Sequence, residues 1–137
     1  MQKLSIVVVF AVLAASQGAI DSRAADKLGK ILIKAATHEV NGQQFPDQAL
    51  EDSAKDLRKK SGGFVLAQDE ADAEYLLVVV ERTEKFVYAA LSFKEGDSWK
   101  PAARLSGDTG RYVCWSCAAG DIMGRAADWV KKNRKRQ

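Results

Sequence analysis

Residues 74–106 have the sequence EYLLVVVERTEKFVYAALSFKEGDSWKPAARLS, and this stretch predicts three consecutive strands. The first, 74–83, has an unbroken apolar centre, which is typical of a central strand covered on both faces, or covered on one face and shielded by aromatic side chains on the other. The second, 86–94, directs alternate side chains to opposite faces. The third, 99–106, contains Pro101, which favours an edge position because proline cannot donate a hydrogen bond to a neighbouring strand.

The residues before this meander predict a strand and an amphipathic helix. A strand opens at Ile31 and can run to about Val40, where Asn41-Gly42 supplies a turn. Pro46 is expected in the first turn of a helix, since its missing N–H has no partner there. The helix spans residues 48–60, where apolar residues recur at i, i+4 and i+7. These residues are Leu50, Ala54 and Leu57.

Charge and glycine mark where this helix ends, and a second helix closes the chain. Basic residues crowd the end of the first helix, which suits the helix dipole, and Ser61-Gly62-Gly63 stops it. Residues 64–67 then predict a short strand. The last helix begins at about Ser116 or Asp121, and its apolar stripe is formed by Ile122, Ala126 and Trp129, flanked by Met123 and Val130.

The expected fold is α+β, a two-layer sandwich in the order strand, helix, four strands, helix, with a mixed sheet and both helices on one face. The length of 137 residues allows one globular unit. We expect this domain over residues 31–132, after a loose lead-in at 19–30 and before a basic tail at 133–137. An apolar content of 47% and a net charge of +3 exclude a disordered chain, and two Cys are too few for a disulfide-dense scaffold.

The start of the chain has the features of a secretory signal peptide. A short cationic opening precedes an apolar run over residues 4–15, and small residues follow it. We expect cleavage after Gly18, with Ser16 and Ala19 as alternatives. A membrane anchor is the competing interpretation, but this run is shorter than the roughly 20 residues that cross a bilayer. The mature protein is therefore expected to be periplasmic or secreted, with no membrane span.

Three segments in this order resemble the amino-terminal domain of TolB and related small periplasmic domains of curli-secretion and penicillin-binding-protein-activator lipoproteins. They are Ile-Leu-Ile at 31–33, Ser-Gly-Gly-Phe at 61–64 after an amphipathic helix, and Ala-Asp-Ala-Glu-Tyr-Leu-Leu-Val at 71–78. The sequence differs from those families in having neither a β-propeller nor the cysteine of a lipid anchor. The resemblance implies an envelope protein that contacts other macromolecules, and it implies no catalytic residues.

The pair Cys114 and Cys117, in Cys-Trp-Ser-Cys, is the sharpest candidate for chemistry. One interpretation is a structural disulfide that ties a loop to the start of the last helix in an oxidising compartment. The other is a redox pair, because the positive end of a helix stabilises a thiolate. A thioredoxin-like arrangement would place the pair after an early strand and would need a later proline facing the sulfurs, and no proline follows here.

No other group of residues predicts a complete active site. His38 with Glu39 has no partner motif that presents a serine nucleophile. A structural zinc site needs four ligands, and two Cys and one His are too few without carboxylates. The acidic residues Asp69, Glu70, Asp72 and Glu74 lack the glycine and spacing of an EF-hand, which favours a solvated turn. We therefore expect no metal, no cofactor and no catalytic residue.

The chain instead offers candidate contacts for a partner. Five cations follow one another closely from the last turn of the final helix into the basic tail, at Lys131, Lys132, Arg134, Lys135 and Arg136. They predict either a solvated tail that complements the helix dipole or a site for anionic lipid or polymer. Trp115 is a candidate contact residue, while Trp129 is expected in the core.

From these features the sequence predicts a non-enzymatic envelope module that binds or scaffolds another envelope protein or an anionic envelope polymer, and not nucleic acid. The alternative function is periplasmic thiol–disulfide exchange through Cys114 and Cys117.

Overall fold

The apolar strand β5 is the centre of a five-stranded sheet in the computed structural model, which describes residues 28–134. The order in the sheet is β4-β1-β5-β6-β7, with β1 parallel to β4 and β5 and the other pairs antiparallel. The strands are β1 (Lys30–Ala35), β4 (Val65–Leu66), β5 (Tyr75–Arg82), β6 (Phe86–Glu95) and β7 (Ser98–Asp108). The edge position predicted for the strand that contains Pro101 is confirmed, because β7 pairs only with β6 within the described sheet.

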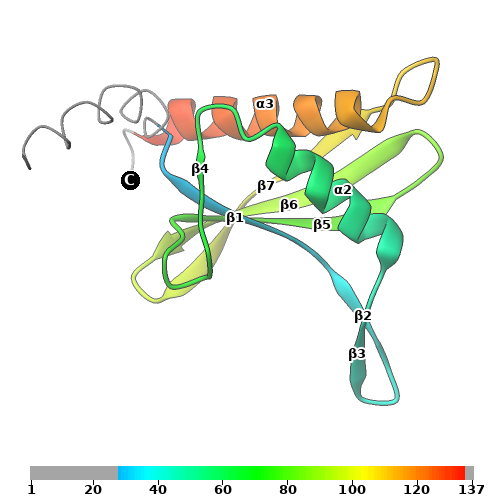
Figure 1. Ribbon diagram of the computed structural model, residues 1–137. Coiled ribbons are helices and arrows are strands. Elements are labelled where there is room, and N and C mark those ends of the chain that lie inside the picture. Colours follow the sequence, from blue (N-terminus) through cyan, green and yellow to red (C-terminus); the bar gives the residue numbers. More distant parts are fainter. Residues whose placement is uncertain (1–27, 135–137) are drawn as a thin grey trace, which may run out of the picture.

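Two helices, α2 (Gln48–Lys59) and α3 (Trp115–Asn133), cover one face of this sheet (Figure 1). The α+β fold with both helices on one face is therefore confirmed. The stripe predicted for α2 is buried, and so is that of α3 except for Trp129, which is half-buried and packs against the edge of the core. In α2 the buried residues are Leu50, Ser53, Ala54 and Leu57, and in α3 they are Ala118, Ala119, Ile122, Met123, Ala126 and Val130.

The core lies between the helices and alternate residues of the strands. Ile31 and Ile33 of β1 are buried, as are Leu77 and Val79 of β5 and every second residue of β6 from Val87 to Leu91. Leu28 is 5% exposed, so the packed domain reaches back to this residue, two positions before β1 begins. Residues 1–27 and 135–137, which include the predicted signal peptide, lie outside the described residues.

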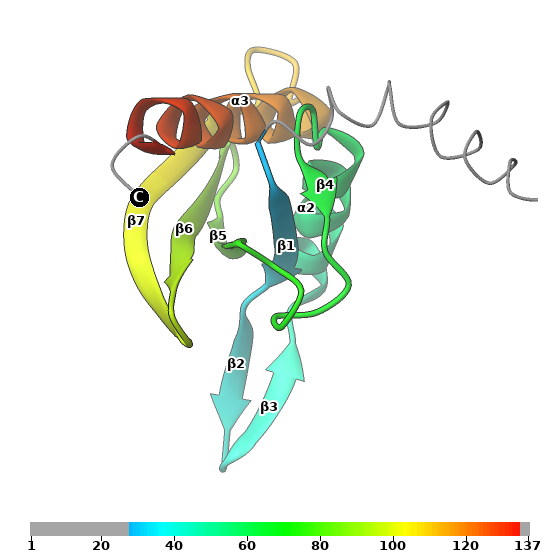
Figure 2. The ribbon, with the colours of Figure 1, turned by 90° about the vertical axis from the view of Figure 1, so that its left-hand side faces the viewer.

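The strand expected over residues 31–40 divides into two. β1 ends at Ala35, and the next N–H, that of Ala36, donates to Val79 O. The chain then leaves the sheet and forms a separate hairpin, residues 37–46, which we call the arm (Figures 1 and 2). It consists of β2 (Thr37–Val40) and β3 (Gln43–Pro46). Asn41-Gly42 is the predicted turn, and both residues have positive φ, as a type I′ hairpin requires.

The start of α2 also differs from expectation. Pro46 is the last residue of β3 and not part of the helix. Asp47 is the N-cap, and its carboxylate accepts hydrogen bonds from Ala49 N and Leu50 N. An aspartate in this position satisfies backbone donors that have no partner within the helix. The proline therefore ends the arm, and the aspartate begins the helix.

The Ser61-Gly62-Gly63 step that follows α2 is explained by two separate constraints. Gly62 has a φ of +60°, which glycine adopts without steric cost. Gly63 packs against Leu28, since a Cβ at residue 63 would lie 2.8 Å from Leu28 Cδ1. Phe64 follows and packs edge-on against Tyr75, with ring centroids 6.0 Å apart. Residues 61–64 thus complete the packing of the core at the end of α2.

Gly107 sets how closely α3 approaches the sheet. A Cβ on this residue of β7 would lie 2.1 Å from the carbonyl oxygen of Ala118. No side chain fits at that distance, so the backbone of β7 and the first turn of α3 meet because residue 107 is glycine. Ala118 itself is completely buried.

We expect Gly107→Ala to lower the free energy of unfolding by about 1–3 kcal/mol or more, because the added methyl group must displace a backbone carbonyl in a packed region. Gly124→Ala is the matched control. A Cβ at residue 124 of α3 meets nothing within 4 Å, so this variant should gain about 0.5–1 kcal/mol of stability from helix propensity. Urea unfolding measures both, and equal effects of the two substitutions would contradict the close approach.

Candidate functional site

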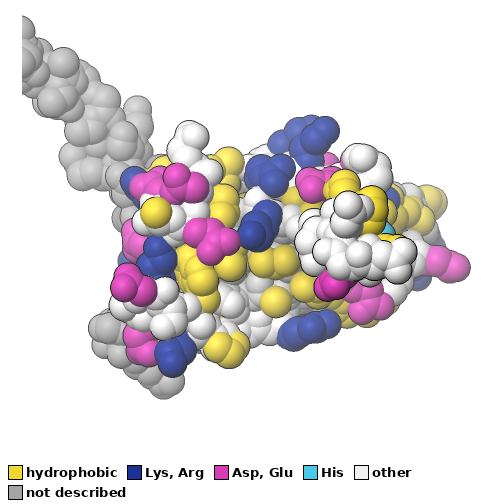
Figure 3. Space-filling view, turned by 90° about the horizontal axis from the view of Figure 1, so that it is seen from below, with side chains coloured by type: hydrophobic (Ala, Val, Ile, Leu, Met, Phe, Trp, Pro, Cys, Tyr) yellow, Lys and Arg dark blue, Asp and Glu magenta, His cyan; other side chains and the backbone are white. Residues whose placement is uncertain are grey.

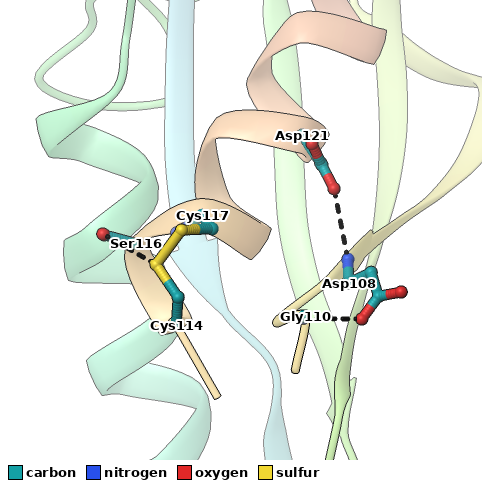
Figure 4. The surroundings of a disulfide bond; sticks show 6 residues. All are labelled: Asp108, Gly110, Cys114, Ser116, Cys117 and Asp121. Atoms are coloured by element: carbon teal, nitrogen blue, oxygen red, sulfur yellow. Dashed lines mark hydrogen bonds between the residues drawn. A yellow bond between two sulfur atoms is a disulfide. The ribbon is translucent and has the colours of Figure 1, made fainter. Parts of the chain in front are cut away.

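Cys114 and Cys117 form a disulfide at the amino end of α3 (Figure 4). Cys114 is the N-cap, and its sulfur accepts a hydrogen bond from Cys117 N at 3.0 Å. The oxidised pair therefore takes the capping role that an Asp or Ser has in other helices. Cys114 is half-buried, whereas Cys117 is exposed to solvent. A reagent in solution can thus reach one of the two sulfur-bearing residues directly.

The loop before the disulfide is held at several points. The side-chain carboxylate of Asp108 accepts a hydrogen bond from Gly110 N (Figure 4). The backbone N–H of Asp108 donates a hydrogen bond to Asp121 Oδ2 of α3. Cys114 N donates to Thr109 O at 2.7 Å. Between these contacts, Val113 has a φ of +54°, a left-handed conformation that costs a β-branched residue energy. The loop therefore holds Val113 in a strained backbone conformation immediately before the first cysteine.

Trp115, predicted as a contact residue, has a neighbour inside the domain. The guanidinium carbon of Arg82 lies 3.7 Å from the centre of the Trp115 ring. The same guanidinium donates to Ala49 O and to the Ser53 hydroxyl of α2. Arg82 therefore joins β5, α2 and the first residue of α3. One face of the Trp115 ring is covered, and the residue is half-buried.

The basic end of α3 lies over the beginning of β7. Trp129 stacks on Phe93 with ring centroids 5.8 Å apart, and Phe93 pairs with Lys100 in the sheet. We call the exposed cations brought to this end of the molecule the basic corner. Its members are Lys100, Lys131, Lys132 and Arg134. Lys135 and Arg136, the other predicted contacts, lie outside the described residues.

The sheet face that points away from the helices forms a second candidate surface, which we call the open face. Strand alternation and register assign its side chains. They are Leu32 and Lys34 of β1, Leu76, Val78 and Glu81 of β5, Phe86, Tyr88, Ala90 and Ser92 of β6, and Pro101, Arg104 and Ser106 of β7. None of them is buried. Figure 3 looks onto this side and shows apolar side chains with both basic and acidic side chains around them.

Residues 67–74, which we call the strap, connect β4 to β5 across one end of the open face (Figure 2). Glu70 pairs with Lys34 Nζ at 3.1 Å and accepts from Trp99 Nε1 at 3.1 Å. Asp72 pairs with Lys30 Nζ at 2.9 Å. Lys94 Nζ donates to Glu70 O at 2.6 Å. The acidic cluster expected to be a solvated turn thus fastens the strap to three strands.

These contacts shift two carboxyl groups. The hydrogen bond from Lys34, followed by that from Trp99, holds the pKa of Glu70 below its ordinary value of 4.5. The hydrogen bond from Lys30 lowers the pKa of Asp72 from 3.8. When the pKa of a carboxyl group is lowered in the folded protein, its contact makes its full contribution to stability at pH values above the ordinary pKa. This contribution is lost as the pH falls through the lowered pKa. The strap is therefore held most firmly at neutral pH.

The described residues bring together no three His, Cys, Asp or Glu side chains that could hold a metal ion. His38 lies in the arm, where its ring stacks on Phe45 with centroids 6.3 Å apart. None of the helices within residues 28–134 has the length and hydropathy needed to cross a bilayer.

Sequence reasoning missed the arm, the strap contacts and the role of Arg82. The Asn41-Gly42 turn with a Gln43–Pro46 partner segment was the available signal for the arm. The other two depend on residues 24 to 42 positions apart, as in Lys94 with Glu70 or Lys30 with Asp72. No local pattern connects residues at that separation.

Comparison of the chain with models of known protein families, with curated proteins and with solved structures gave no match.

We expect Arg82→Met to lower the free energy of unfolding by about 1–3 kcal/mol, because it removes a cation–π contact and two charge-assisted hydrogen bonds. Arg104→Met is the control, since Arg104 is exposed and makes no ion pair with a described residue. Chemical denaturation compares the two variants. A loss in Arg104→Met as large as that in Arg82→Met would refute the linking role.

Lys34→Met should raise the pKa of Glu70 toward 4.5, because the largest cause of its lowering is the hydrogen bond from Lys34. The shift can be followed by NMR titration of the Glu70 side-chain carboxyl. Lys55→Met changes an exposed lysine of α2 and should leave this titration unchanged. A Glu70 titration that is the same in Lys34→Met and in the unmodified protein would show that the contact is absent in solution.

Proposed function

We propose that this protein is an exported, non-enzymatic module of the bacterial envelope that binds or scaffolds an anionic partner through its basic corner. The observation that carries the proposal is that Lys131, Lys132 and Arg134 are exposed at the end of α3, whose Trp129 stacks on Phe93, the strand neighbour of Lys100. Lys100 itself lies 3.9 Å from Glu95 Oε1. Cations gathered on one surface raise the local concentration of an anionic ligand and speed its association. Scattered over the surface, the same charges would have a smaller effect.

The free edge of β7 adds a second element to this surface. Pro101 lies beside Lys100 at the corner, and the strand continues to Asp108 with no neighbour on its outer side within the described sheet. An extended segment can add to such an edge through main-chain hydrogen bonds, with proline limiting where pairing begins. The partner we propose is another envelope protein with an acidic segment, or an anionic envelope polymer.

Export is part of the proposal and rests on the leader-like residues 1–18. A disulfide between Cys114 and Cys117 is compatible with an oxidising compartment. The resemblance to the TolB amino-terminal domain supports the same location and the same kind of role. These features support a location in the periplasm or outside the cell.

A second candidate, thiol–disulfide exchange, is favoured by one observation, the solvent exposure of Cys117 at a helix amino terminus. A substrate thiolate would attack Cys117 Sγ, which forms a mixed disulfide between the substrate and Cys117 and releases Cys114 as a thiolate. The second thiolate of the substrate would then attack the substrate sulfur of this mixed disulfide and release Cys117 as a thiolate. The substrate dithiol is oxidised to a disulfide, and the protein disulfide is reduced to a dithiol.

Reversing three charges, Lys131→Glu, Lys132→Glu and Arg134→Glu, should abolish retention of envelope components by the immobilised protein. If each cation contributes about 1 kcal/mol, as at an anionic surface, binding weakens at least 100-fold. Retention should also fall steeply with added salt. The control reverses Lys55 and Lys59 of α2, which are equally exposed. Retention that survives the reversal at the corner, or is lost in the control, refutes the proposed site.

The exchange function predicts a reduced cysteine with a thiol pKa well below about 8.5, because the helix amino terminus would stabilise its thiolate. Alkylation rates of the reduced protein, measured against pH, give this value. A structural disulfide predicts an ordinary pKa and slow reduction by small thiols. A rate profile that rises only near the ordinary thiol pKa would eliminate the exchange function and leave the binding function intact.

A further inference from the structure

The tip of the arm is the two-residue turn Asn41-Gly42, and the arm protrudes from the domain (Figures 1 and 2). Both residues have positive φ, 52° at Asn41 and 82° at Gly42, and both are exposed. A Cβ built on Gly42 would meet nothing within 4 Å, and Gly42 N donates no hydrogen bond to a described residue. The backbone nitrogen that follows Asn41 is therefore unshielded and unbonded.

An asparagine followed by glycine carries two groups that can react with each other. The backbone nitrogen of the glycine can attack Cγ of the asparagine, which closes a five-membered ring without any bound reactant. Glycine favours this attack, because it has no Cβ to crowd the nitrogen and its backbone rotates most freely. The sequence contains Asn-Gly once, at 41–42, and contains no Asp-Gly. The reaction is therefore expected at the tip of the arm.

Ring closure requires the turn to rearrange, and the arm can open without disturbing the domain. All eight residues of β2 and β3 are exposed. A two-stranded hairpin on its own is at most marginally stable in water, and segments with few buried contacts open most readily. Buried Ala35 and Leu50 lie just before and just after the arm. The packed domain therefore stays closed on both sides while the arm opens.

The other asparagine of the chain, Asn133, has the opposite surroundings. It is the last residue of α3, and its Nδ2 donates a hydrogen bond to Trp129 O at 2.8 Å. The residue that follows it is Arg134, whose backbone N–H donates to Val130 O. The nitrogen that would have to attack is thus held in a helical hydrogen bond, and its residue carries a long side chain. Asn133 is therefore an internal control within the same molecule.

We propose that Asn41 is a site of covalent modification, at which the asparagine converts to aspartate and isoaspartate. Gly42 N attacks Asn41 Cγ and loses its proton to solvent, and the side-chain nitrogen leaves as ammonia, so that a cyclic imide is formed. Water then opens the ring. Addition of water at Cγ gives aspartate, whereas addition at the main-chain carbonyl carbon gives isoaspartate, in which the main chain runs through Cβ and Cγ. Water is the only co-reactant, and nothing is oxidised or reduced.

The isoaspartate product should take the arm apart. The register of a hairpin is set by its turn type and loop length, and the isoaspartyl link adds one main-chain atom to a loop of two residues. Aspartate adds a negative charge but keeps the length of the main chain. The isoaspartate form should therefore lose the pairing of His38 with Phe45, whereas the aspartate form should keep it. This modification is confined to the arm, so it does not depend on the proposed binding function.

Incubation of the protein expressed from the full 137-residue sequence, near neutral pH and under conditions in which circular dichroism shows it folded, tests the modification. Peptide mapping by mass spectrometry follows the replacement of the side-chain NH₂ by OH and separates isoaspartate from aspartate. Asn41 should convert at least tenfold faster than Asn133, into a mixture of the two products.

Two glycine variants test the attacking nitrogen. Gly42→Ala should slow the conversion of Asn41 at least fivefold, because the new Cβ crowds this nitrogen. Gly96→Ala is the matched control. Gly96 also lies in an exposed turn, with a φ of 64° and nothing within 4 Å of a built Cβ, so this variant should leave the conversion unchanged.

An Asn41 that stays intact as long as Asn133 overturns the proposal. So does aspartate as the single product, because direct hydrolysis of the side chain forms no imide, or a rate that is unchanged in Gly42→Ala. NMR tests the effect on the arm by comparing the isoaspartate form with the Asn41→Asp variant. Contact between His38 and Phe45 should persist in Asn41→Asp and be absent from the isoaspartate form, and its presence in both would refute the loss of the hairpin. Retention at the basic corner is measured separately and fails independently.

Discussion

The contact between Gly107 and Ala118 determines where the last helix lies. Because no Cβ fits between β7 and the Ala118 carbonyl, the first turn of α3 rests directly on the backbone of the edge strand. The helix then runs along the sheet until Trp129 stacks on Phe93. Both candidate sites on α3 follow from this placement, since the disulfide lies at its amino end and the basic corner at its carboxyl end.

Both helices pack on one face of the sheet, so no helix covers the opposite face. A parallel pair of strands needs a crossover, and α2 provides it between β1 and β4 on the covered side. The return from β4 to β5 is made by the strap, which lies on the other side and covers only one end of the open face. The fold therefore leaves an edge, an open face and a protruding arm available for contacts.

The sequence predicted only those features of the candidate site that are set by residues close together in the chain. The Cys114 and Cys117 pair is separated by two residues, and a disulfide between them at the helix start was one of the two interpretations. The covering of Trp115 by Arg82 was not predictable, because it joins residues on different elements. The convergence of Lys100 with the end of α3 depends in the same way on the register of β6 and β7.

The sequence by itself determined the identity of the elements, since hydrophobic periodicity, proline and glycine act over a few residues. It predicted both helices, the central strand, the edge strand and the order of the layers. The tertiary structure alone decided that the first strand breaks at Ala36 into a separate arm, and that the acidic residues at 70 and 72 pair with lysines of β1. These outcomes depend on which distant segments meet, and local propensity carries no information about that.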